Sequence, residues 1–246
     1  MAPTDRVAVI TGGARGIGGA AALALAAEGV QVVIGDVLAA EGEATAAAIR
    51  QAGGEAVFVR CDVSGEADCQ ALMAAAIEDY GRLDVLICSA GILRGAFMPV
   101  EEMDEALFSG VMDVNVKGAF LCVKHAVPWM RQVGGGVILL LASGAGVRGP
   151  SSSVAYGASK GAVHGMAMTL ERSLAPLGIR VNDVCPGGID TAMRREVALE
   201  SARLAGQPPE EALAAAGFGD PAGLARLLAF LASPEADYVR GTVFAR

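Results

Sequence analysis

Two residues four positions apart, Tyr156 and Lys160 in the segment Tyr-Gly-Ala-Ser-Lys, have side chains that suit proton transfer. On a helix this spacing puts both side chains on one face, one turn apart. An ammonium beside a tyrosine stabilises the phenolate and lowers the tyrosine pKa from its usual value of about 10, as a general acid and base requires. A solvated tyrosine and lysine on a helix surface would give the same letters, so the pair alone does not decide between the two interpretations.

Ser143 adds a hydroxyl to this pair. It follows the apolar run Val137–Leu141, which we expect to be a strand, and it precedes the expected helix that carries Tyr156. Ligands bind at the carboxyl ends of the strands in α/β sheets. A serine at such an end can donate a hydrogen bond to a substrate oxygen, and the three residues together favour the catalytic interpretation.

A glycine-rich segment, Thr11-Gly-Gly-Ala-Arg-Gly-Ile-Gly18, connects the apolar run Val7–Ile10 to an alanine-rich stretch. Glycines allow a tight turn, a close approach of the backbone to a pyrophosphate and close packing of a helix on a strand. The N–H groups at the start of a helix bind phosphate. We therefore predict a dinucleotide site that includes Gly12, Arg15, Gly16, Ile17 and Gly18. The spacing is GxxxGxG and not GxGxxG, and a turn that is merely tight is the alternative interpretation.

Asp36 stands at the end of the second expected strand, at the distance from the glycines where dinucleotide-binding folds place an acidic residue. Its carboxylate can accept hydrogen bonds from the adenosine ribose hydroxyls, and it would repel a 2′-phosphate. We therefore predict that the cofactor is NAD(H) and not NADP(H). Arg15 argues the other way, because its guanidinium could pair with an extra phosphate.

Short apolar runs alternate with longer alanine-rich stretches along the chain. The expected strands are Val7–Ile10, Val30–Ile34, Ala56–Val59, Val85–Cys88, Val137–Leu141 and Ile179–Val184. The expected helices are Gly16–Glu28, Ala39–Gln51, Glu66–Tyr80, Glu102–Arg131, which could be two helices, and Ala155–Leu174. This alternation implies right-handed crossovers and an α/β fold with a doubly wound parallel sheet of the Rossmann type, covered by helices on both faces.

The chain after Pro186 is less regular. A polar stretch that contains glycine and proline, at about 190–216, is predicted to be a substrate lid. An apolar helix near Gly223–Leu231 and a last short strand follow. Because no linker, repeat or block of charge divides the chain, residues 1–246 are expected to form a single domain.

Composition argues against several classes of protein. The net charge of −8 would repel a phosphate backbone, so nucleic acid is not an expected partner. Five cysteines without a CxxC pair, and two histidines, predict neither a disulfide framework nor a metal site. No apolar run has the length of about 20 residues that spans a bilayer, and the first residues lack the apolar region of a signal peptide. We expect a cytoplasmic protein that does not bind membranes.

Together these residues resemble the short-chain dehydrogenase/reductase family. The glycine-rich segment is similar to the family's TGxxxGxG cofactor turn, Tyr156 and Lys160 are similar to its YxxxK pair, and Ser143 stands at its catalytic serine position. Asn115, in Asn-Val-Lys-Gly, resembles its catalytic asparagine. The resemblance covers about residues 6–191 and implies a sheet of seven parallel strands.

Further cofactor contacts are implied by the same resemblance. Asp62-Val63 matches the pair that contacts the adenine ring, and the segment from Pro186 to Thr191 resembles the PGxxxT segment beside the nicotinamide. Where the family has Asn-Asn-Ala-Gly, this chain has Cys-Ser-Ala-Gly91, and Ser89 is expected to replace part of the missing hydrogen bonding. The full set implied for NAD is Gly12, Arg15, Gly16, Ile17, Gly18, Asp36, Asp62, Val63, Ser89, Ala90, Gly91, Tyr156, Lys160, Pro186, Gly187, Ile189 and Thr191.

The family mechanism, carried over to this sequence, has Tyr156 exchange a proton with the substrate oxygen while a hydride moves to or from the nicotinamide. Lys160 would lower the Tyr156 pKa and hold the nicotinamide ribose, and Ser143 would orient the substrate oxygen. Asn115 would anchor a water molecule in a proton relay. The predicted activity is the NAD-dependent interconversion of a small-molecule secondary alcohol and a ketone.

Two other functions stay open. The redox site could be specialised for 3-oxoacyl or hydroxyacyl thioesters, or the same fold could serve a nucleotide sensor without catalysis, although a sensor has no need of a general acid. The resemblance also implies a homodimer or homotetramer. The last residues, Gly-Thr-Val-Phe-Ala-Arg246, differ from the Val-Asp-Gly-Gly segment with which many relatives continue, and this weakens the oligomer prediction.

Some residues near the expected site need no role in it. Arg148, Arg194 and Arg195 flank the expected pocket, where they could meet an acidic substrate or simply remain solvated. His164, one turn beyond the catalytic lysine, is interpreted as a surface or interface residue, and Cys185 as a small buried residue.

Overall fold

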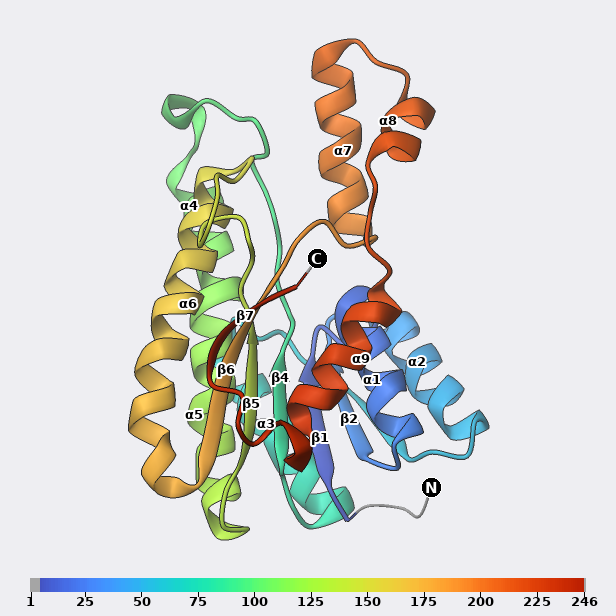
Figure 1. Ribbon diagram of the computed structural model, residues 1–246, viewed down its shortest axis with the longest axis vertical. Helices are drawn as coiled ribbons and strands as arrows, with labels where there is room; N and C mark the ends of the chain where they lie inside the picture. The colour runs from blue at the N-terminus through green and yellow to red at the C-terminus, as the bar shows by residue number, and fades with distance from the viewer. Residues whose placement is uncertain (1–4, 246) are drawn as a thin grey trace.

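Seven strands run parallel in one sheet in the computed structural model, which describes residues 5–245 (Figure 1). Their order across the sheet is β3-β2-β1-β4-β5-β6-β7. Every strand expected from the apolar runs is present, with bounds that differ by no more than two residues, and the predicted doubly wound α/β fold is confirmed. The strands are β1 (Val7–Thr11), β2 (Gln31–Asp36), β3 (Ala56–Arg60), β4 (Val85–Cys88), β5 (Gly136–Leu141), β6 (Ile179–Pro186) and β7 (Gly241–Ala245).

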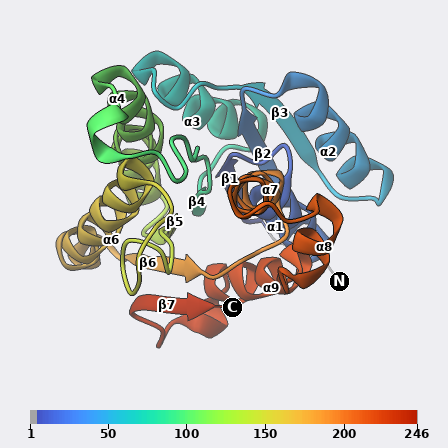
Figure 2. The ribbon, with the colours of Figure 1, turned by 90° about the horizontal axis from the view of Figure 1, so that it is seen from above.

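Helices cover both faces of the sheet (Figure 2). α1 (Gly16–Ala27), α2 (Ala39–Gln51) and α9 (Pro221–Ala232) pack on one face, and α3 (Glu66–Tyr80), α5 (Gly118–Gln132) and α6 (Val154–Leu174) pack on the other. The residues Val7 to Ile10 of strand β1 are all apolar because both faces of the strand are buried. Val7 and Val9 belong to the core beneath α3 and α5, while Ala8 and Ile10 belong to the core beneath α1 and α9. Successive side chains of a strand point to opposite faces, so a strand that is buried on both faces is largely apolar at successive positions.

The chain changes its direction across the sheet between β1 and β4. β2 and β3 lie in succession on one side of β1, and β4 to β7 lie in succession on the other. Where the strand order reverses in this way, the connections leave the carboxyl ends of the two central strands toward opposite sides, and a crevice remains between them. The loops after β1 and β4 therefore border the place where such folds bind ligands.

The segment expected to hold one or two helices is continuous. It runs from α4 (Glu105–Met112) through the π-helical turn η2 (Asp113–Lys117) into α5. By length and composition the stretch Glu105–Gln132 could cross a membrane. Its apolar character has a local cause, since residues of α5 such as Cys122 and Met130 are buried in the core against the sheet and α3. The π-helical turn carries Asn115, and such turns are frequent at functional sites.

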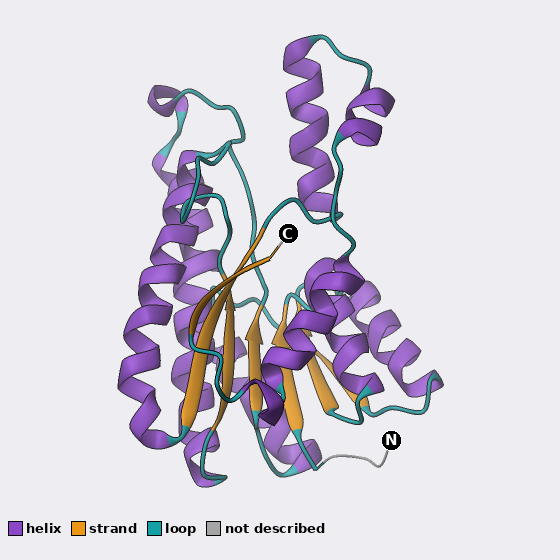
Figure 3. Cartoon of the chain, viewed as in Figure 1, coloured by secondary structure: helices purple, strands orange, loops and turns teal. Residues whose placement is uncertain are grey.

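Two helices, α7 (Ala192–Ala205) and α8 (Pro209–Ala215), occupy the stretch in which the sequence shows only a loose pattern. Thr191 begins α7, because its hydroxyl accepts a hydrogen bond from the N–H of Arg194 at 3.3 Å, and Gly206 ends it with a φ of 65°. Only Val197 and Ala202 are buried in α7, and no residue is buried in α8, so the apolar periodicity of a packed helix is absent. Both helices stand above the carboxyl edge of the sheet (Figure 3).

The last strand lies at the edge of the sheet, where it pairs with β6. Its Thr242 donates a hydrogen bond to the buried carboxylate of Asp183 on β6 at 2.8 Å. His164 of α6 lies 2.8 Å from the same carboxylate, so the imidazole joins α6 to the sheet. Short 3₁₀ turns at Val100–Glu102, Ala175–Leu177 and Pro234–Ala236 complete the connections.

Candidate active site

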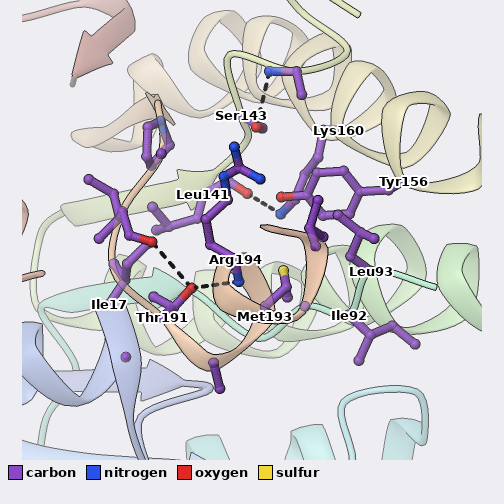
Figure 4. Close-up of a pocket in the computed structure, with 18 of the residues that line it drawn as sticks. Ile17, Ile92, Leu93, Leu141, Ser143, Tyr156, Lys160, Thr191, Met193 and Arg194 are labelled. Carbon is purple, nitrogen blue, oxygen red and sulfur yellow. Dashed lines mark hydrogen bonds between the residues drawn. The ribbon is translucent and has the colours of Figure 1, made fainter. Parts of the chain in front are cut away.

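A cavity of about 1100 Å³ lies above the carboxyl ends of the strands (Figure 4). Its walls come from the glycine-rich turn after β1, the loops after the other central strands, the start of α6, and α7 with α8. Of the residues predicted from the sequence to be catalytic or to bind the cofactor, Gly18 and Asn115 do not line it. Those that do are Gly12, Arg15, Gly16, Ile17, Asp36, Asp62, Val63, Ser89, Ala90, Gly91, Ser143, Tyr156, Lys160, Pro186, Gly187, Ile189 and Thr191.

The glycine-rich turn leaves no room for side chains at two of its glycines. Gly12 has a φ of 66°, and a Cβ atom there would lie 2.7 Å from the Cα atom of Ala90. A Cβ atom on Gly18 would lie 2.2 Å from the carbonyl oxygen of Gly12. Gly18 therefore serves the packing of α1 against the turn and does not face the cavity. The turn itself ends at the start of α1, where main-chain N–H groups bind phosphate.

Asp36 is fixed between two loops. Its Oδ2 accepts a hydrogen bond from the N–H of Ala14 at 3.0 Å, and its Oδ1 accepts one from the N–H of Leu38 at 3.1 Å. Each carboxylate oxygen has a further lone pair, and the side chain lines the cavity. The carboxylate can thus position the glycine-rich turn and still accept hydrogen bonds from a ribose.

Asp62 and Val63 follow β3 on the same side of the cavity. The Ser64 hydroxyl and N–H donate to Asp62 Oδ1 at 2.7 and 3.0 Å, and these hydrogen bonds lower the pKa of the Asp62 carboxyl. Val63 is buried against α5, where a Cβ atom on Gly118 would lie 2.7 Å from it. Cys61 also lines the cavity, and no feature of the sequence pointed to it.

The first residues of the loop after β4 are held by β1, in the absence of the two amide side chains that the family has there. The N–H of Ser89 donates to the carbonyl of Thr11 at 3.2 Å, and the N–H of Ala90 donates to the Thr11 hydroxyl at 3.3 Å. Thr11 is buried, so both hydrogen bonds are shielded from water. This anchoring keeps Ser89 and Gly91 at the cavity wall although both family asparagines are replaced.

Tyr156 and Ser143 face each other in the catalytic part of the cavity. The hydroxyl of Ser153 begins α6 by accepting a hydrogen bond from the N–H of Tyr156 at 3.2 Å. Burial raises the pKa of Tyr156, and a hydrogen bond with Ser143 partly offsets the rise. Ser143 therefore lies where it can orient an oxygen that Tyr156 protonates.

Burial and the hydrogen bond with Ser143 set the direction of the Tyr156 pKa shift in this structure, and the lowering of that pKa by Lys160 stays a prediction. Its ammonium donates a hydrogen bond to the carbonyl of Leu141 at 2.6 Å and lies 5.6 Å from the centre of the Tyr156 ring. Burial dominates the electrostatics of both groups, because it raises the pKa of Tyr156 and lowers that of Lys160 to about 8. Lys160 thus exchanges its own proton near neutral to mildly basic pH.

The side chain of Asn115 forms its hydrogen bonds within the protein, and its role in anchoring a water molecule stays a prediction. Its amide donates to the carbonyl of Ile92 and to the Ser159 hydroxyl, both at 2.9 Å, and its Oδ1 accepts from the N–H of Ile92 at 2.8 Å. The side chain is buried and its hydrogen bonds join the loop after β4 to α6. Asn115 is a positioning residue for the neighbourhood of Lys160.

The segment from Pro186 to Thr191 joins the sheet to α7. The carbonyl of Pro186 accepts a hydrogen bond from the N–H of Gly144 at 3.0 Å, and the N–H of Gly187 donates to Ala245 at 2.8 Å. A Cβ atom on Gly16 would lie 3.4 Å from the Thr191 methyl group. The root of α7 therefore touches the glycine-rich turn.

Part of the cavity wall carried no signal in the sequence. Ile92, Leu93 and Phe97 from the loop before α4 line the cavity together with Val197 of α7. Phe97 has a φ of 59°, which bulky residues rarely adopt, and its N–H donates to Ser152 at 2.6 Å. Loop conformation places Ile92, Leu93 and Phe97, and apolar residues in a loop have no recognisable spacing.

Four of the five other residues near the expected site lie outside the cavity. Cys185 is buried, as expected, and His164 bonds Asp183 outside the cavity. Arg148 lies over the Phe244 ring at 3.7 Å, and Arg195 pairs with Asp190. Arg194, in contrast, lines the cavity.

The cavity fits a dinucleotide. Two glycines keep the turn at the start of α1 free of side chains, Asp36 faces the same space, and Tyr156 and Lys160 lie in that one cavity. The family model for short chain dehydrogenases matches residues 6–202. The chain belongs to the short-chain dehydrogenase/reductase family, and it is an oxidoreductase that uses a nicotinamide cofactor.

Individual relatives have related activities. The chain is 40% identical to cis-4-hydroxycyclohexanecarboxylate dehydrogenase from Sinomonas cyclohexanicum, over 98% of this chain and 94% of the relative. It is 34% identical to a 3-oxoacyl-[acyl-carrier-protein] reductase from Synechocystis, over 98% and 95% of the two chains. Among solved structures, an actinorhodin polyketide ketoreductase with NADPH superimposes with a TM-score of 0.92 at 32% identity, over 98% and 97% of the chains.

Proposed function

We propose that this protein is an NAD(H)-dependent dehydrogenase that interconverts a cyclic secondary alcohol and the corresponding ketone. The observation that carries the proposal is the convergence of Ser143, Tyr156 and Lys160 on one cavity with the glycine-rich turn and Asp36. A sensor would not need a buried lysine and a tyrosine hydrogen-bonded to a serine. The general acid and its supporting groups therefore favour catalysis.

The chain's own residues manage the proton and the substrate oxygen. The nicotinamide, when bound, accepts or donates the hydride. Tyr156 takes the alcohol proton in oxidation and returns it in reduction, and the Ser143 hydroxyl donates a hydrogen bond to the same oxygen as negative charge develops there. Lys160, with a pKa of about 8, supplies a positive charge near the phenolate and can pass on its proton. Asn115 holds the loop after β4 against α6 through its hydrogen bonds to Ile92 and Ser159.

Asp36 supports NAD over NADP. Its carboxylate is fixed by two main-chain N–H groups, so it cannot swing away from a 2′-phosphate without losing both hydrogen bonds. Repulsion between like charges held close together can reach several kcal/mol. Since about 1.4 kcal/mol corresponds to a factor of ten in affinity, we expect a preference for NAD over NADP of roughly tenfold or more. Arg15, which is exposed and lines the cavity, is the residue that would oppose this preference.

The substrate class is supported by the wall and by a relative. Ile92, Leu93, Phe97 and Val197 offer apolar contacts to a compact ring. The relative that is 40% identical is named for a hydroxycyclohexanecarboxylate, which is a secondary alcohol on a six-membered ring. A second candidate is the reduction of a 3-oxoacyl thioester, which is favoured by the similarity to the 3-oxoacyl-[acyl-carrier-protein] reductase.

A substrate panel tests the proposal. Cyclohexanols, cyclohexanones and 3-oxoacyl thioesters are offered with NAD(H) and with NADP(H), and the absorbance of the reduced cofactor is followed. We expect turnover of the ring compounds, at least roughly tenfold higher kcat/KM with NAD(H), and slower turnover of the thioesters.

Tyr156→Phe tests the catalytic role of the tyrosine hydroxyl. It removes one hydroxyl and should reduce kcat by roughly 100-fold or more while the dissociation constant of NADH stays within about a factor of two. Faster turnover of thioesters than of free ketones would favour the second candidate. Absence of turnover on every compound, with intact NADH binding, would favour the sensor.

A further inference from the structure

The cavity separates its charged side chains. Among residues 5–245, the carboxylates that line it are those of Asp36, at the end of β2, and Asp62, in the loop after β3. Its arginines are Arg15 in the glycine-rich turn, Arg94 in the loop before α4, and Arg194 in α7. The part of the wall that includes Arg94 and Arg194 therefore carries positive charge and no negative charge. In a protein with a net charge of −8, such a local excess of positive charge attracts an anion.

Arg194 is held in place at this wall. Its guanidinium carbon lies 5.7 Å from the centre of the Phe218 ring, and a Cβ atom on Gly188 would lie 3.6 Å from its Nε. The two neighbours are themselves tied together, because the N–H of Gly219 donates to the carbonyl of Gly188 at 2.7 Å. Although the side chain is exposed, one aromatic ring and the backbone of Gly188, in the segment between β6 and α7, restrict its position.

The charge of Arg194 is not neutralised within the described chain. The adjacent Arg195 donates to the carboxylate of Asp190 at 2.7 Å, and Arg203 on the same helix donates to Glu200 at 2.7 Å. Arg194 forms no ion pair with any carboxylate of residues 5–245. An arginine presents a planar set of N–H donors that matches a carboxylate in a bidentate manner.

Figure 4 shows how Arg194 lies relative to the catalytic groups. Its side chain extends from the start of α7 into the cavity, in the same view as Ser143, Tyr156 and Lys160, with Met193, Leu93 and Ile92 along the wall. A substrate with an oxygen at Ser143 and Tyr156 and an anionic group at Arg194 would have Met193, Leu93 and Ile92 of the same cavity available for its apolar body. Such a molecule has a polar reacting end, an apolar body and a negative end.

We propose that Arg194 binds a carboxylate of the substrate, and that the natural substrate is a hydroxy or oxo acid with an apolar ring between the reacting carbon and the carboxylate. This inference rests on the proposed function, since it assigns the substrate class of the same site. Arg194 is a specificity residue in this proposal. It contributes to the capture of the acid and takes no part in proton transfer.

The test uses two compounds of the same shape, cis-4-hydroxycyclohexanecarboxylate and its uncharged carboxamide. Each is oxidised by the unchanged enzyme, by Arg194→Gln and by Arg203→Gln, which removes the same charge from an exposed part of the same helix. We expect Arg194→Gln to lower kcat/KM for the acid by roughly 10- to 100-fold, mainly through KM, as the loss of a charged hydrogen-bonded pair does. The carboxamide kcat/KM and the dissociation constant of NADH should stay within about a factor of two.

Three outcomes would overturn the proposal. An equal loss for acid and carboxamide would show that Arg194 supports the fold of α7 and not charge recognition. A weaker affinity for NADH in Arg194→Gln would assign the guanidinium to the cofactor phosphates. A selective loss for the acid in Arg94→Gln but not in Arg194→Gln would assign the carboxylate to the loop before α4.

A binding measurement separates this proposal from the proposed function. Calorimetry of cyclohexanecarboxylate and of cyclohexanecarboxamide with the NADH complex needs no turnover. If neither alcohol is oxidised, the proposed function is wrong for ring alcohols, while a selective weakening of carboxylate binding in Arg194→Gln still supports the assignment of Arg194. Equal affinity of the unchanged protein for carboxylate and carboxamide overturns it.

Discussion

Lys160 combines a charged form with burial, and this is an electrostatic conflict within the site. It is 5% exposed, and its ammonium has the carbonyl of Leu141 as its hydrogen-bond acceptor. Burial disfavours the charged form and lowers the pKa of Lys160 from 10.5 to about 8. The protein tolerates this cost because the same position allows the lysine to act next to Tyr156, as strained or unfavourable groups do at active sites.

The conflict predicts a pH dependence of stability. Between pH values of about 8 and about 10.5 the unfolded chain holds a proton on Lys160 that the folded chain has released, so the free energy of unfolding should rise with pH in this window. Below it both states are protonated and the burial penalty is fully present. Relative to Lys160→Met, the unchanged protein should gain up to about 3 kcal/mol across the window. Urea denaturation over this pH range measures the difference.

The control for this prediction is Lys117→Met, which removes an exposed lysine that pairs with Asp113. Its pH profile should follow that of the unchanged protein. Profiles of Lys160→Met and the unchanged protein that run parallel would contradict the assigned pKa.

The identity of the site residues could be predicted from the sequence, but their hydrogen-bond partners could not. Ser143, Tyr156 and Lys160 line one cavity as their motifs indicate. The acceptor of the lysine is a carbonyl at the end of β5, and the partners of Asn115 are the main chain of Ile92 and the Ser159 hydroxyl. A main-chain partner leaves no mark in a sequence, because every residue type has a carbonyl.

At the scale of elements, the turn between β1 and α1 is the most tightly packed part of the site. A Cβ atom on Gly18 would lie 2.2 Å from the carbonyl oxygen of Gly12, so the first turn of α1 and the glycine-rich turn share one space. Neither backbone segment can move independently, since Gly12 is packed against Ala90 on its other side.

Gly18→Ala should therefore damage both stability and cofactor binding. We expect a loss of about 1–3 kcal/mol in the free energy of unfolding, as overpacking causes, and NADH binding that is weaker by roughly tenfold or more. Chemical denaturation measures the change in the free energy of unfolding. Fluorescence during titration with NADH measures the change in affinity.

Gly165→Ala is the matched control, because this glycine lies inside α6 and a Cβ atom there meets nothing within 4 Å. It should stabilise the protein by about 0.5–1 kcal/mol and leave NADH affinity unchanged. Equal effects of the two substitutions would contradict the packing role assigned to Gly18.

Elements that pack on the sheet were predictable, and those that stand away from it were not. The strands and the helices α1, α2, α3 and α6 carry apolar residues because the core demands them, so their bounds are close to those expected. α7 and α8 pack chiefly on each other, and few of their residues are buried. Their sequence therefore predicts a polar stretch and not two helices. Helices whose faces meet solvent on most sides have little apolar periodicity to detect.

On the scale of the whole molecule, several of the exposed large apolar side chains belong to neighbouring helices or to the edge strand. Phe108, Phe120 and Met168 are exposed on α4, α5 and α6, and Phe244 is exposed on the edge strand β7. The helices α4, α5 and α6 lie on the same side of the molecule, as Figures 1 and 2 both show. Exposed apolar patches of this kind are typical of protein interfaces. We propose that the protein is a homodimer or homotetramer and that the surface of these three helices contributes to it.

Phe120→Asp tests the proposed assembly. The side chain is 50% exposed, so a charge there costs little in an isolated subunit but is buried at an interface. We expect the unchanged protein to sediment as a dimer or tetramer and Phe120→Asp to sediment as a smaller species in analytical ultracentrifugation. Leu204→Asp, at a 55% exposed position on α7, should leave the mass unchanged. A monomeric unchanged protein would contradict the proposal.

The arrangement of the whole sheet was predictable because it follows from general rules. Right-handed crossovers between parallel strands, with one reversal, give the observed order once the strands and the family resemblance are known. The position of α7 above the site was not predictable, since it depends on single contacts such as Thr191 with Gly16 and Gly219 with Gly188.

The contact between Thr191 and Gly16 has a kinetic consequence. Viewed from above, α7 stands end-on over β1 and the start of α1, so the phosphate-binding turn lies beneath the root of that helix (Figure 2). Arg194 lies in the first turn of the same helix, and its side chain extends into the cavity. We expect a dinucleotide at the turn beneath this helix to arrive before the substrate and to depart after the product. We therefore expect compulsory-order kinetics, with NADH as a competitive inhibitor toward NAD and the ketone as a noncompetitive one.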